Sequence, residues 1–281
     1  MKKIFDEVSQ KCSEITTKHY STSFSLGIKL LDKKIHNPIY SIYGFVRFAD
    51  EIVDSFHDYN KKELLQQFKS ETKDAIKNKI SLNPILNSFQ HVVNKFNIEW
   101  EHIEHFLNSM ENDLEKKEHD QESYKKYIKG SAEAVGLMCL RVFCNNKNQL
   151  YDELEKYAVN LGSVFQKVNF IRDISADYNQ LQRVYFPDLD IQNFNETEKE
   201  KIENDIEREF NLALIGIKRL PISSKKGVYL AYSYYYSLFN KIKAIPAKKI
   251  MIERIRIPDF LKILILIKVE FKSLFGLIWK I

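Results

Sequence analysis

The chain has 281 residues with only 8 glycines and 6 prolines, so few turns are encoded and long helices are favoured over many short strands. Apolar residues make up 44% and charged residues 29%, the composition of an ordinary globular protein. The net formal charge of +5 is too small and too dispersed to indicate a nucleic-acid-binding protein, but it suits an anionic substrate or an anionic membrane surface.

The three cysteines, Cys12, Cys139 and Cys144, are odd in number and have no CxxC spacing. This pattern indicates a reducing compartment and no disulfide framework. The N-terminal segment MKKIFDEVSQ contains acidic residues and no apolar stretch. We therefore expect no secretory signal and predict a cytoplasmic location.

Helical periodicity runs through nearly the whole chain, and no repeat or change of composition separates two domains. We predict one all-α domain over residues 1–281. The predicted helices cover residues 2–18, 38–56, 61–78, 84–96, 99–118, 122–145, 150–181, 196–219, 223–243 and 258–280, with one long loop at 183–194. The pairs Asn37-Pro38 and Asn83-Pro84 are predicted helix starts, with asparagine as the cap and proline in the first turn.

The helix that contains residues 38–54 is apolar around most of its circumference and yet carries several charges. Asp50 and Asp54 are four residues apart, so both carboxylates project from one face, and Arg47 and Tyr43 lie near the same side. Buried charges are costly unless they are paired or bind a metal. Two oxygen ligands on one face suit a hard ion such as Mg²⁺. The alternative is a helix with surface ion pairs, and the spacing alone leaves both interpretations open.

A second apolar segment, residues 162–187, repeats this arrangement. Asn169, Asp173 and Asp177 follow one another at four-residue intervals and form a stripe of oxygen ligands. Other polar residues near this stripe are Gln166, Arg172 and, in the following loop, Arg183. Two acidic stripes, each on an apolar helix and each with arginines, are hard to explain as solvated surface.

Two acidic helices that face each other would form a metal cluster that binds a diphosphate through bridging Mg²⁺, with Mn²⁺ as the alternative ion. Arginines would neutralise the remaining oxygens, and metal and arginine together would stabilise a departing diphosphate. The allylic carbocation left behind must be kept from water, which predicts an apolar and aromatic cavity. The 15 tyrosines and 19 phenylalanines suit such a cavity, although a bias of base composition explains them equally well.

The C-terminal segment 258–281 is apolar and amphipathic. Charged residues interrupt it at Lys262, Lys268, Glu270 and Lys272, so it is not expected to span a membrane. Two interpretations stay open: a helix packed on the core, or an interfacial helix in peripheral contact with the inner face of the cytoplasmic membrane. In the second case the side chains that would enter the lipid are Phe271, Phe275 and Trp279, and the lysines, including Lys280, would favour anionic headgroups.

Five segments, in order along the chain, resemble the squalene/phytoene synthase family, in particular its bacterial phytoene synthase branch. They are HYSTSFSLGIKLL from His19, YGFVRFADEIVD with the first aspartates, YIKGSAEAVGLM over 127–138, QKVNFIRDISADYNQLQRVYFP with the second aspartates, and ERIRIPDFLKIL from Glu253. The resemblance covers nearly the whole chain. It implies a single-domain, isoprenoid-synthase-type helical bundle around a central cavity.

The resemblance also implies roles for individual residues. The expected Mg²⁺ ligands are Asp50, Asp54, Asn169, Asp173 and Asp177. The expected diphosphate-binding residues are Arg47, Arg172, Arg183 and Arg254, with Gln166 in contact with a phosphate or an intermediate. Ser21, Ser23 and Phe24 would lie near a substrate head group. The four aspartates, together with Tyr43, Tyr127 and Tyr236 at the reaction centre, are the predicted catalytic residues.

Two features depart from the family pattern. The family often has a glycine before the arginine of the second aspartate motif, where this chain has Gln182. The spacing from Asp177 to Arg183 is also one residue longer than usual. Both differences concern the placement of Arg183 rather than membership of the family.

The activity that the resemblance implies is the head-to-head condensation of two prenyl diphosphates by a Mg²⁺-dependent prenyltransferase, through a cyclopropylcarbinyl diphosphate. The phytoene branch implies geranylgeranyl diphosphate as substrate and phytoene, a carotenoid precursor, as product, with no need for NADPH. The alternatives are farnesyl diphosphate with dehydrosqualene or squalene as product, and an inactive relative that acts as an assembly or lipid-binding factor. RDISAD does not fit the second metal motif of a cyclising terpene synthase. No nucleic acid and no obligate protein partner are expected.

Overall fold

The computed structural model describes residues 1–115, 118–187, 189–252 and 254–276. Its long helices are α1 (Lys2–Tyr20), α3 (Lys33–Asp54), α4 (Lys61–Asn78), α5 (Pro84–Phe96), α6 (Trp100–Glu115), α9 (Asn148–Ala176), α10 (Glu196–Arg219), α11 (Ile222–Lys243) and α13 (Asp259–Leu274). The shorter ones are α2 (Thr22–Lys29), α7 (Gln121–Ile128), α8 (Ala134–Cys144) and α12 (Ala247–Ile250). No strand occurs in these ranges, apart from an isolated bridge between Glu118 and Val184, which confirms the all-α prediction.

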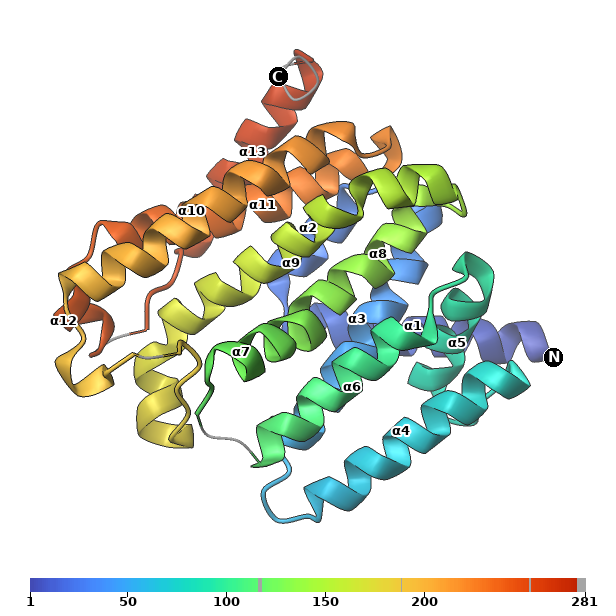
Figure 1. Cartoon of the computed structure of the whole chain (residues 1–281). Helices are drawn as coiled ribbons and strands as arrows, with labels where there is room; N and C mark the ends of the chain where they lie inside the picture. The colour runs from blue at the N-terminus through green and yellow to red at the C-terminus, as the bar shows by residue number, and fades with distance from the viewer. Residues whose placement is uncertain (116–117, 188, 253, 277–281) are drawn as a thin grey trace.

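Helix α9 runs through the middle of the bundle (Figure 1). Helices α10 and α11 pack on one side of it and α8 on the other, while α3, α5 and α6 continue the bundle beyond α8. One large apolar core joins α9, α10 and α11, and a second joins α3, α4, α5 and α6. The second core is centred on Phe45, whose ring stacks on Phe89 with centroids 3.9 Å apart.

Most of the predicted helices are present, and one of the two proposed caps is observed. The Asn83 side chain accepts hydrogen bonds from the backbone N–H groups of Ile85 and Leu86 at the start of α5. Asn195 caps α10 in a complete capping box with Glu198. The sequence did not reveal α2 or α12, because both are short and α2 contains serine, threonine and glycine, which are weak helix formers without tertiary contacts.

The predicted helix start at Asn37-Pro38 is wrong. Helix α3 begins at Lys33, because the side chain of Asp32 accepts a hydrogen bond from the backbone N–H of Lys34 at 2.9 Å. The backbone N–H of Asp32 in turn donates to the Ser223 carbonyl at 2.8 Å, so contact with α11 fixes the cap. Pro38 therefore lies inside the helix, where it removes one backbone hydrogen bond near the N-terminal end.

The single helix predicted over residues 122–145 is interrupted by a π-helical turn, η1 (Lys129–Glu133), between α7 and α8. This turn lies against α6, and a Cβ atom on Gly130 would be only 2.3 Å from the His105 carbonyl oxygen. The wider turn and the glycine together allow the two backbones to approach closely.

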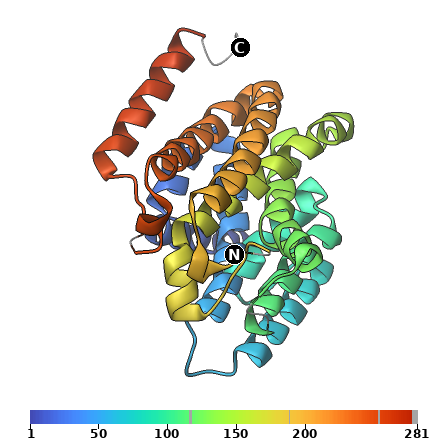
Figure 2. The same cartoon turned by 60° about the vertical axis from the view of Figure 1, so that its left-hand side comes forward.

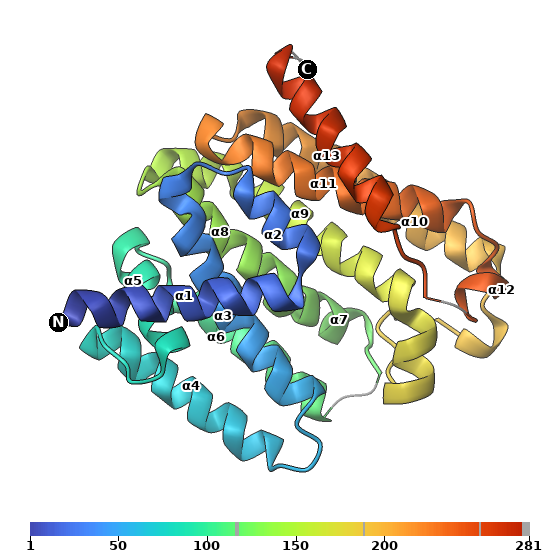
Figure 3. The same ribbon diagram turned by 180° about the vertical axis from the view of Figure 1, so that it is seen from behind.

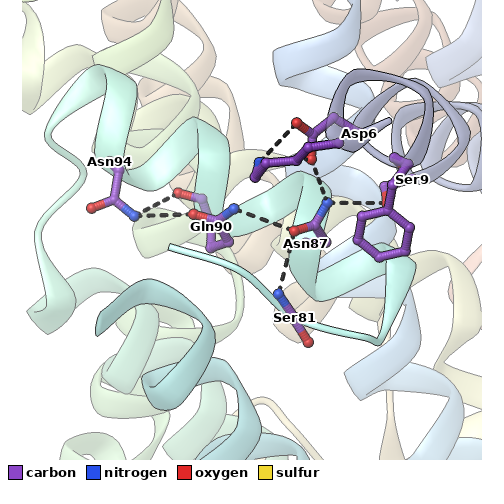
Figure 4. Close-up of polar contacts among 8 residues, drawn as sticks. Asp6, Ser9, Ser81, Asn87, Gln90 and Asn94 are labelled. Atoms are coloured by element: carbon purple, nitrogen blue, oxygen red, sulfur yellow. Dashed lines mark hydrogen bonds and ion pairs between the residues drawn. The ribbon is translucent and has the colours of Figure 1, made fainter. Parts of the chain in front are cut away.

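Helix α1 packs on α5 through polar side chains, which Figure 4 shows around Asn87. The Asn87 amide donates to Asp6 at 3.0 Å and to the Ser9 hydroxyl at 3.1 Å, and its oxygen accepts from the backbone N–H of Ser81. Further along the same interface, Ser13 and Ser88 share a buried hydrogen bond of 2.6 Å. The inward face of α1 is thus small and polar, whereas its residues Ile4, Val8 and Ile15 are exposed.

Glycines set the closest contacts between the helices that surround the interior of the bundle. A Cβ atom on Gly162 of α9 would lie 2.6 Å from the Ala132 carbonyl oxygen and 3.0 Å from the Glu133 Cα atom. Both of these are backbone atoms of η1, which cannot move aside independently. Only glycine at this position allows α9 to touch the π-helical turn.

The close contact predicts that Gly162→Ala lowers the free energy of unfolding by about 1–3 kcal/mol, because the overpacking strain exceeds the gain in helix propensity. Urea denaturation monitored by circular dichroism measures this change. Gly27→Ala is the matched control, since its nearest neighbour would be 3.6 Å away and its stability should stay within about 1 kcal/mol of wild type. Equal stabilities of the two variants would contradict the prediction.

Candidate active site

A cavity of about 530 Å³ lies between α2, α3, α8, α9, α10 and α11. Its lining along α9 extends from Leu154 to Arg172, a helical rise of about 27 Å. Most of the wall is apolar or aromatic, and the charged residues Arg47, Asp50 and Arg172 lie at one end. The volume lies within the range of small-molecule sites, and the predicted central cavity is therefore present.

The first aspartate stripe lies at the C-terminal end of α3. The Arg47 guanidinium donates to Asp50 at 2.8 Å and also contacts Glu51, and it stacks 4.3 Å above the Tyr20 ring. Asp54 follows one turn later, at the last residue of the helix. Burial and the neighbouring Asp54 carboxylate raise the pKa of Asp50 to about 7. The protein therefore holds two carboxylates together at an electrostatic cost that a bound cation would relieve.

The second stripe lies where α9 ends. Asn169 and Asp173 belong to α9, and Asp177 begins a π-helical turn, η2 (Asp177–Leu181). Burial and the Asp173 carboxylate raise the pKa of Asp177 to about 7. The conditions at the two stripes are thus the same: carboxylates one turn apart, partly removed from water.

The π-helical turn η2 accounts for both departures from the family pattern. A π-turn holds one more residue than an α-turn, which accommodates the additional residue between Asp177 and Arg183. Gln182 ends the turn with φ 54° and ψ 37°, a left-handed conformation in which glycine is favoured. The Arg183 side chain still reaches the site, so the longer spacing does not displace it.

Arg183 connects the two stripes. Its backbone N–H donates to the Asp177 carbonyl at 2.9 Å, and its guanidinium lies 3.6 Å from the Asp54 carboxylate. The second half of the guanidinium donates to the Asp113 carbonyl of α6 at 2.8 Å. Arg183 therefore links the ends of the two stripes, and Asp50 of the first stripe and Asn169 of the second both line the cavity.

Arg172 and Arg254 both hold Asp173. Arg254 forms a two-pronged contact with the carboxylate, with Nε–Oδ1 and Nη2–Oδ2 distances of 2.6 and 3.2 Å, and Arg172 donates from Nε at 2.9 Å. Arg254 follows α12, so the segment after α11 returns to the site. Glu253, the first residue of the family-like segment ERIRIPDFLKIL, lies outside the described residues.

The remaining predicted residues divide between the cavity wall and its surroundings. Ser21 caps α2 by accepting from the Phe24 N–H, and both residues line the cavity. Phe24 packs against Tyr43, with ring centroids 5.6 Å apart. Gln166 also lines the cavity, next to Asn169. Ser23 is half-buried and does not line it, so the structure does not bring Ser23 to the predicted position.

Tyr236 is not on the cavity wall, contrary to the prediction. Its ring packs edge-on against Phe210, with centroids 5.2 Å apart, and stacks on Tyr232. The neighbouring Tyr235 lines the cavity instead and stacks on Phe165 at 4.0 Å. Several tyrosines follow one another in α11, so the sequence does not show which of them lines the cavity. The rotation of the helix decides which ring points inward.

Tyr127 lines the cavity and donates a hydrogen bond of 2.7 Å to Asp113, a buried residue that the sequence analysis did not single out. Burial is the main cause that raises the pKa of Asp113 to about 7, against the opposing influence of Arg183. Tyr185 packs beside Tyr127, with centroids 5.2 Å apart, and contacts Arg183. Asp113 follows Met110 by three residues and therefore lies on the apolar side of α6. This spacing in the sequence could have identified it as a buried carboxylate.

The residues present fit a magnesium ion that is shared with a diphosphate. Within the described ranges, no group of three or more His, Cys, Asp or Glu side chains is placed to hold a metal alone. Mg²⁺ in phosphate chemistry usually takes only one or two carboxylates, with phosphate and water oxygens as the other ligands. Each stripe offers two carboxylates, and the buried Oδ1 atom of Asn169 has no hydrogen-bond partner.

These features define a helical protein of the isoprenoid-synthase type. A family model described as squalene/phytoene synthase matches residues 17–260, and the chain belongs to this family. Among solved structures, it is similar to a dehydrosqualene synthase, with a TM-score of 0.82 and 19% identity over 95% of this chain and 97% of the other. It is also similar to squalene synthase HpnC from Alicyclobacillus acidocaldarius, with a TM-score of 0.73 and 20% identity over 85% and 93% of the two chains.

Curated relatives with assigned activities share only about a quarter of their aligned residues with this chain. A presqualene diphosphate synthase from Rhodopseudomonas palustris is 26% identical over 59% of this chain, and phytoene synthase 1 of Solanum lycopersicum is 23% identical over 86%. The chain spans 58% and 62% of the lengths of these two relatives. A phytoene synthase from Arthrospira platensis is 22% identical over 83% of this chain and 82% of its own length.

The raised pKa of Asp113 predicts a specific pH dependence of stability. The folded protein keeps this proton up to about pH 7, whereas the unfolded chain releases it near the ordinary value of 3.8. The folded state binds more protons between these values, so this group lowers wild-type stability as the pH rises through them. The free energy of unfolding of Asp113→Asn does not fall in this way. Relative to wild type it should therefore rise by about 2 kcal/mol as the pH increases from about 5 to about 8.

Denaturant unfolding at several pH values measures the difference. Asp152→Asn, at an exposed position near the start of α9, is the matched control and should follow the wild-type profile. If Asp113→Asn and wild type show parallel stability profiles, Asp113 is not protonated in the folded state near neutral pH.

Proposed function

We propose that the protein is a Mg²⁺-dependent prenyltransferase that joins two molecules of geranylgeranyl diphosphate head to head to form phytoene. The observation that carries this proposal is the meeting of two aspartate stripes and four arginines at one end of a long apolar cavity. Relatives named phytoene synthase, from tomato and from Arthrospira, support the choice of product.

The polar end of the cavity would bind the diphosphates. Asp50, Asp54, Asp173 and Asp177, with Asn169, are the residues that would hold Mg²⁺. Bound Mg²⁺ supplies Lewis-acid stabilisation of the departing diphosphate. The guanidinium groups of Arg47, Arg172 and Arg183 lie among these carboxylates and are positioned to take phosphate oxygens, a geometry in which arginine forms paired hydrogen bonds.

The apolar part of the cavity protects the cationic intermediates. Phe24, Tyr43, Phe165 and Tyr235 line it next to the charged end, where aromatic faces stabilise a passing cation and exclude water. Tyr127 is held by its hydrogen bond to Asp113, so its ring keeps one orientation in the wall. In the overall reaction two diphosphates and two protons leave, two C20 chains become one C40 hydrocarbon, and no reductant is consumed.

A second candidate has farnesyl diphosphate as substrate, with presqualene diphosphate, dehydrosqualene or squalene as product. The similarity to a relative named presqualene diphosphate synthase favours it. Squalene would require a reductant, whereas dehydrosqualene would not.

The purified protein should convert geranylgeranyl diphosphate to phytoene in the presence of Mg²⁺, and EDTA should abolish the conversion because the carboxylates then lack a counter-ion for the diphosphate. Mass spectrometry of the extracted products measures this, with farnesyl diphosphate tested in parallel. Exclusive formation of thirty-carbon products would select the second candidate, and absence of any condensation product from folded protein would refute both.

Both aspartate stripes should be essential. Asp50→Asn and Asp173→Asn should each reduce turnover by about 100-fold to 1,000-fold, the scale of losing one major electrostatic group at a reaction centre. Initial-rate assays at saturating Mg²⁺ measure the effect, and Asp152→Asn at the far end of α9 should retain wild-type turnover. Near-normal turnover of both stripe variants, with the fold intact, would show that the metal assignment is wrong.

We further propose a cytoplasmic protein in peripheral contact with the inner face of the cytoplasmic membrane, because a hydrocarbon product of this length is insoluble in water. None of the described helices has the length and apolar character needed to cross a bilayer.

A further inference from the structure

The C-terminal helix α13 turns its apolar side away from the protein. Phe260, Ile267, Phe271 and Leu274 are 61, 57, 58 and 81% exposed, and Val269 is the buried residue of this helix. The exposed residues, together with Ile263, recur at intervals of three and four and therefore form one continuous face. Figure 2 shows α13 standing at the edge of the bundle, with this helix in contact with the remainder along one side.

The inner side of α13 packs on α11. Val269 contacts Leu230 and Tyr234 of α11, and Leu26 and Leu30 of α2 pack against the same small cluster. The Tyr234 hydroxyl donates to the Lys262 carbonyl at 3.0 Å, and Lys226 pairs with Glu270 at 2.6 Å. These contacts hold α13 in one orientation, so its outward apolar face is a fixed feature of the described structure. Trp279 and Lys280 lie outside the described residues.

Helix α11 lies between α13 and the cavity, because its Tyr234 packs with Val269 of α13 while its Tyr235 lines the cavity. Phe24, Gly27 and Ile28 of α2 also line the cavity, and Leu26 of the same helix packs against the cluster that contains Val269. Figure 3 shows α2 and α13 on the same side of the molecule. A Cβ atom on Gly227 would lie 2.6 Å from the Gly27 carbonyl oxygen, so α2 and α11 meet there backbone to backbone. The apolar interior therefore comes within one helix of the exposed apolar face.

The segments around this face are basic. Residues 22–34, 222–226 and 258–276 contain eight lysines and three acidic residues, which gives this side a net formal charge of +5, equal to that of the whole chain. Lys268 and Lys29 are exposed at its edge. An apolar helical face surrounded by lysines is complementary to a bilayer that contains anionic lipids.

We propose that the outward face of α13, formed by Phe260, Ile263, Ile267, Phe271 and Leu274, binds the surface of an anionic lipid bilayer. The proposal rests on the proposed function for the nature of the product. It deepens that function because the cavity wall formed by α11 would then lie one helix away from the lipid that receives an insoluble hydrocarbon. Lipid binding itself requires no catalysis.

Vesicle flotation with the full chain tests the proposal. Vesicles of phosphatidylcholine with phosphatidylglycerol should carry wild-type protein to the top of the gradient, and pure phosphatidylcholine vesicles or high salt should weaken this binding. The double variant Ile267→Glu/Phe271→Glu should bind at least about tenfold more weakly, because two exposed apolar anchors are replaced by charges of the same sign as the lipid.

A matched control carries the same two charge changes elsewhere. Ile80 and Leu82 are also exposed, at the far end of the molecule between α4 and α5, and Ile80→Glu/Leu82→Glu should float like wild type. Thermal unfolding by circular dichroism verifies that each variant is folded. In the presence of detergent, all three proteins should form product at equal rates, whereas anionic vesicles should accelerate wild type and the control only.

Two results would overturn the proposal. One is a folded wild-type protein that stays at the bottom with anionic vesicles at low salt. The other combines two measurements: analytical ultracentrifugation shows that wild type is a dimer and that Ile267→Glu/Phe271→Glu is a monomer, while flotation of the two proteins is the same. In that case α13 binds a second copy of the chain rather than lipid. Absence of product under every condition would refute the proposed function and leave the flotation result unaffected.

Discussion

Mutual repulsion of carboxylates at one end of an apolar cavity is the constraint on which the rest of this structure depends. Asp50 and Asp177 both have a pKa near 7, because each is buried beside a second carboxylate. Arginines from three separate parts of the chain offset this repulsion, and Arg183 touches both stripes. The helices must therefore converge on the guanidinium groups as well as on the apolar core. A site of this kind costs stability in the free protein and provides affinity for a metal–diphosphate complex.

Departures from regular α-helix occur where the backbone borders the site. The π-helical turn η1 brings Ser131 and Ala132 to the cavity wall, and η2 carries Asp177. Each turn adjoins a special backbone position: Gly162 packs closely against η1, and the left-handed Gln182 follows η2. Such turns redirect side chains without ending the helix, which is why they are frequent at functional sites.

The two helices at the outside of the bundle, α1 and α13, depart from the usual distribution of apolar residues. Helix α1 buries serine and threonine hydroxyls, which are satisfied by Asn87 and Ser88 of α5 or by the backbone of α1 itself, and it leaves Ile4, Val8 and Ile15 in solvent. Helix α13 buries little more than Val269. Packing on the bundle therefore does not explain the exposed apolar residues of α13, and this is the observation on which the proposed lipid contact rests.

The sequence by itself determined the all-α class, most helix boundaries, and the two stripes with their arginines, because these depend on residue spacing along single helices. Tertiary structure decided everything that depends on helix rotation or on distant contacts. Contact between Asp32 and Ser223 moved the start of α3 away from Asn37-Pro38, and the rotation of α11 put Tyr235 rather than Tyr236 on the cavity wall. Burial of Asp113 and the outward orientation of α13 have the same origin: an amphipathic pattern identifies a face, and only the neighbouring helices decide what that face meets.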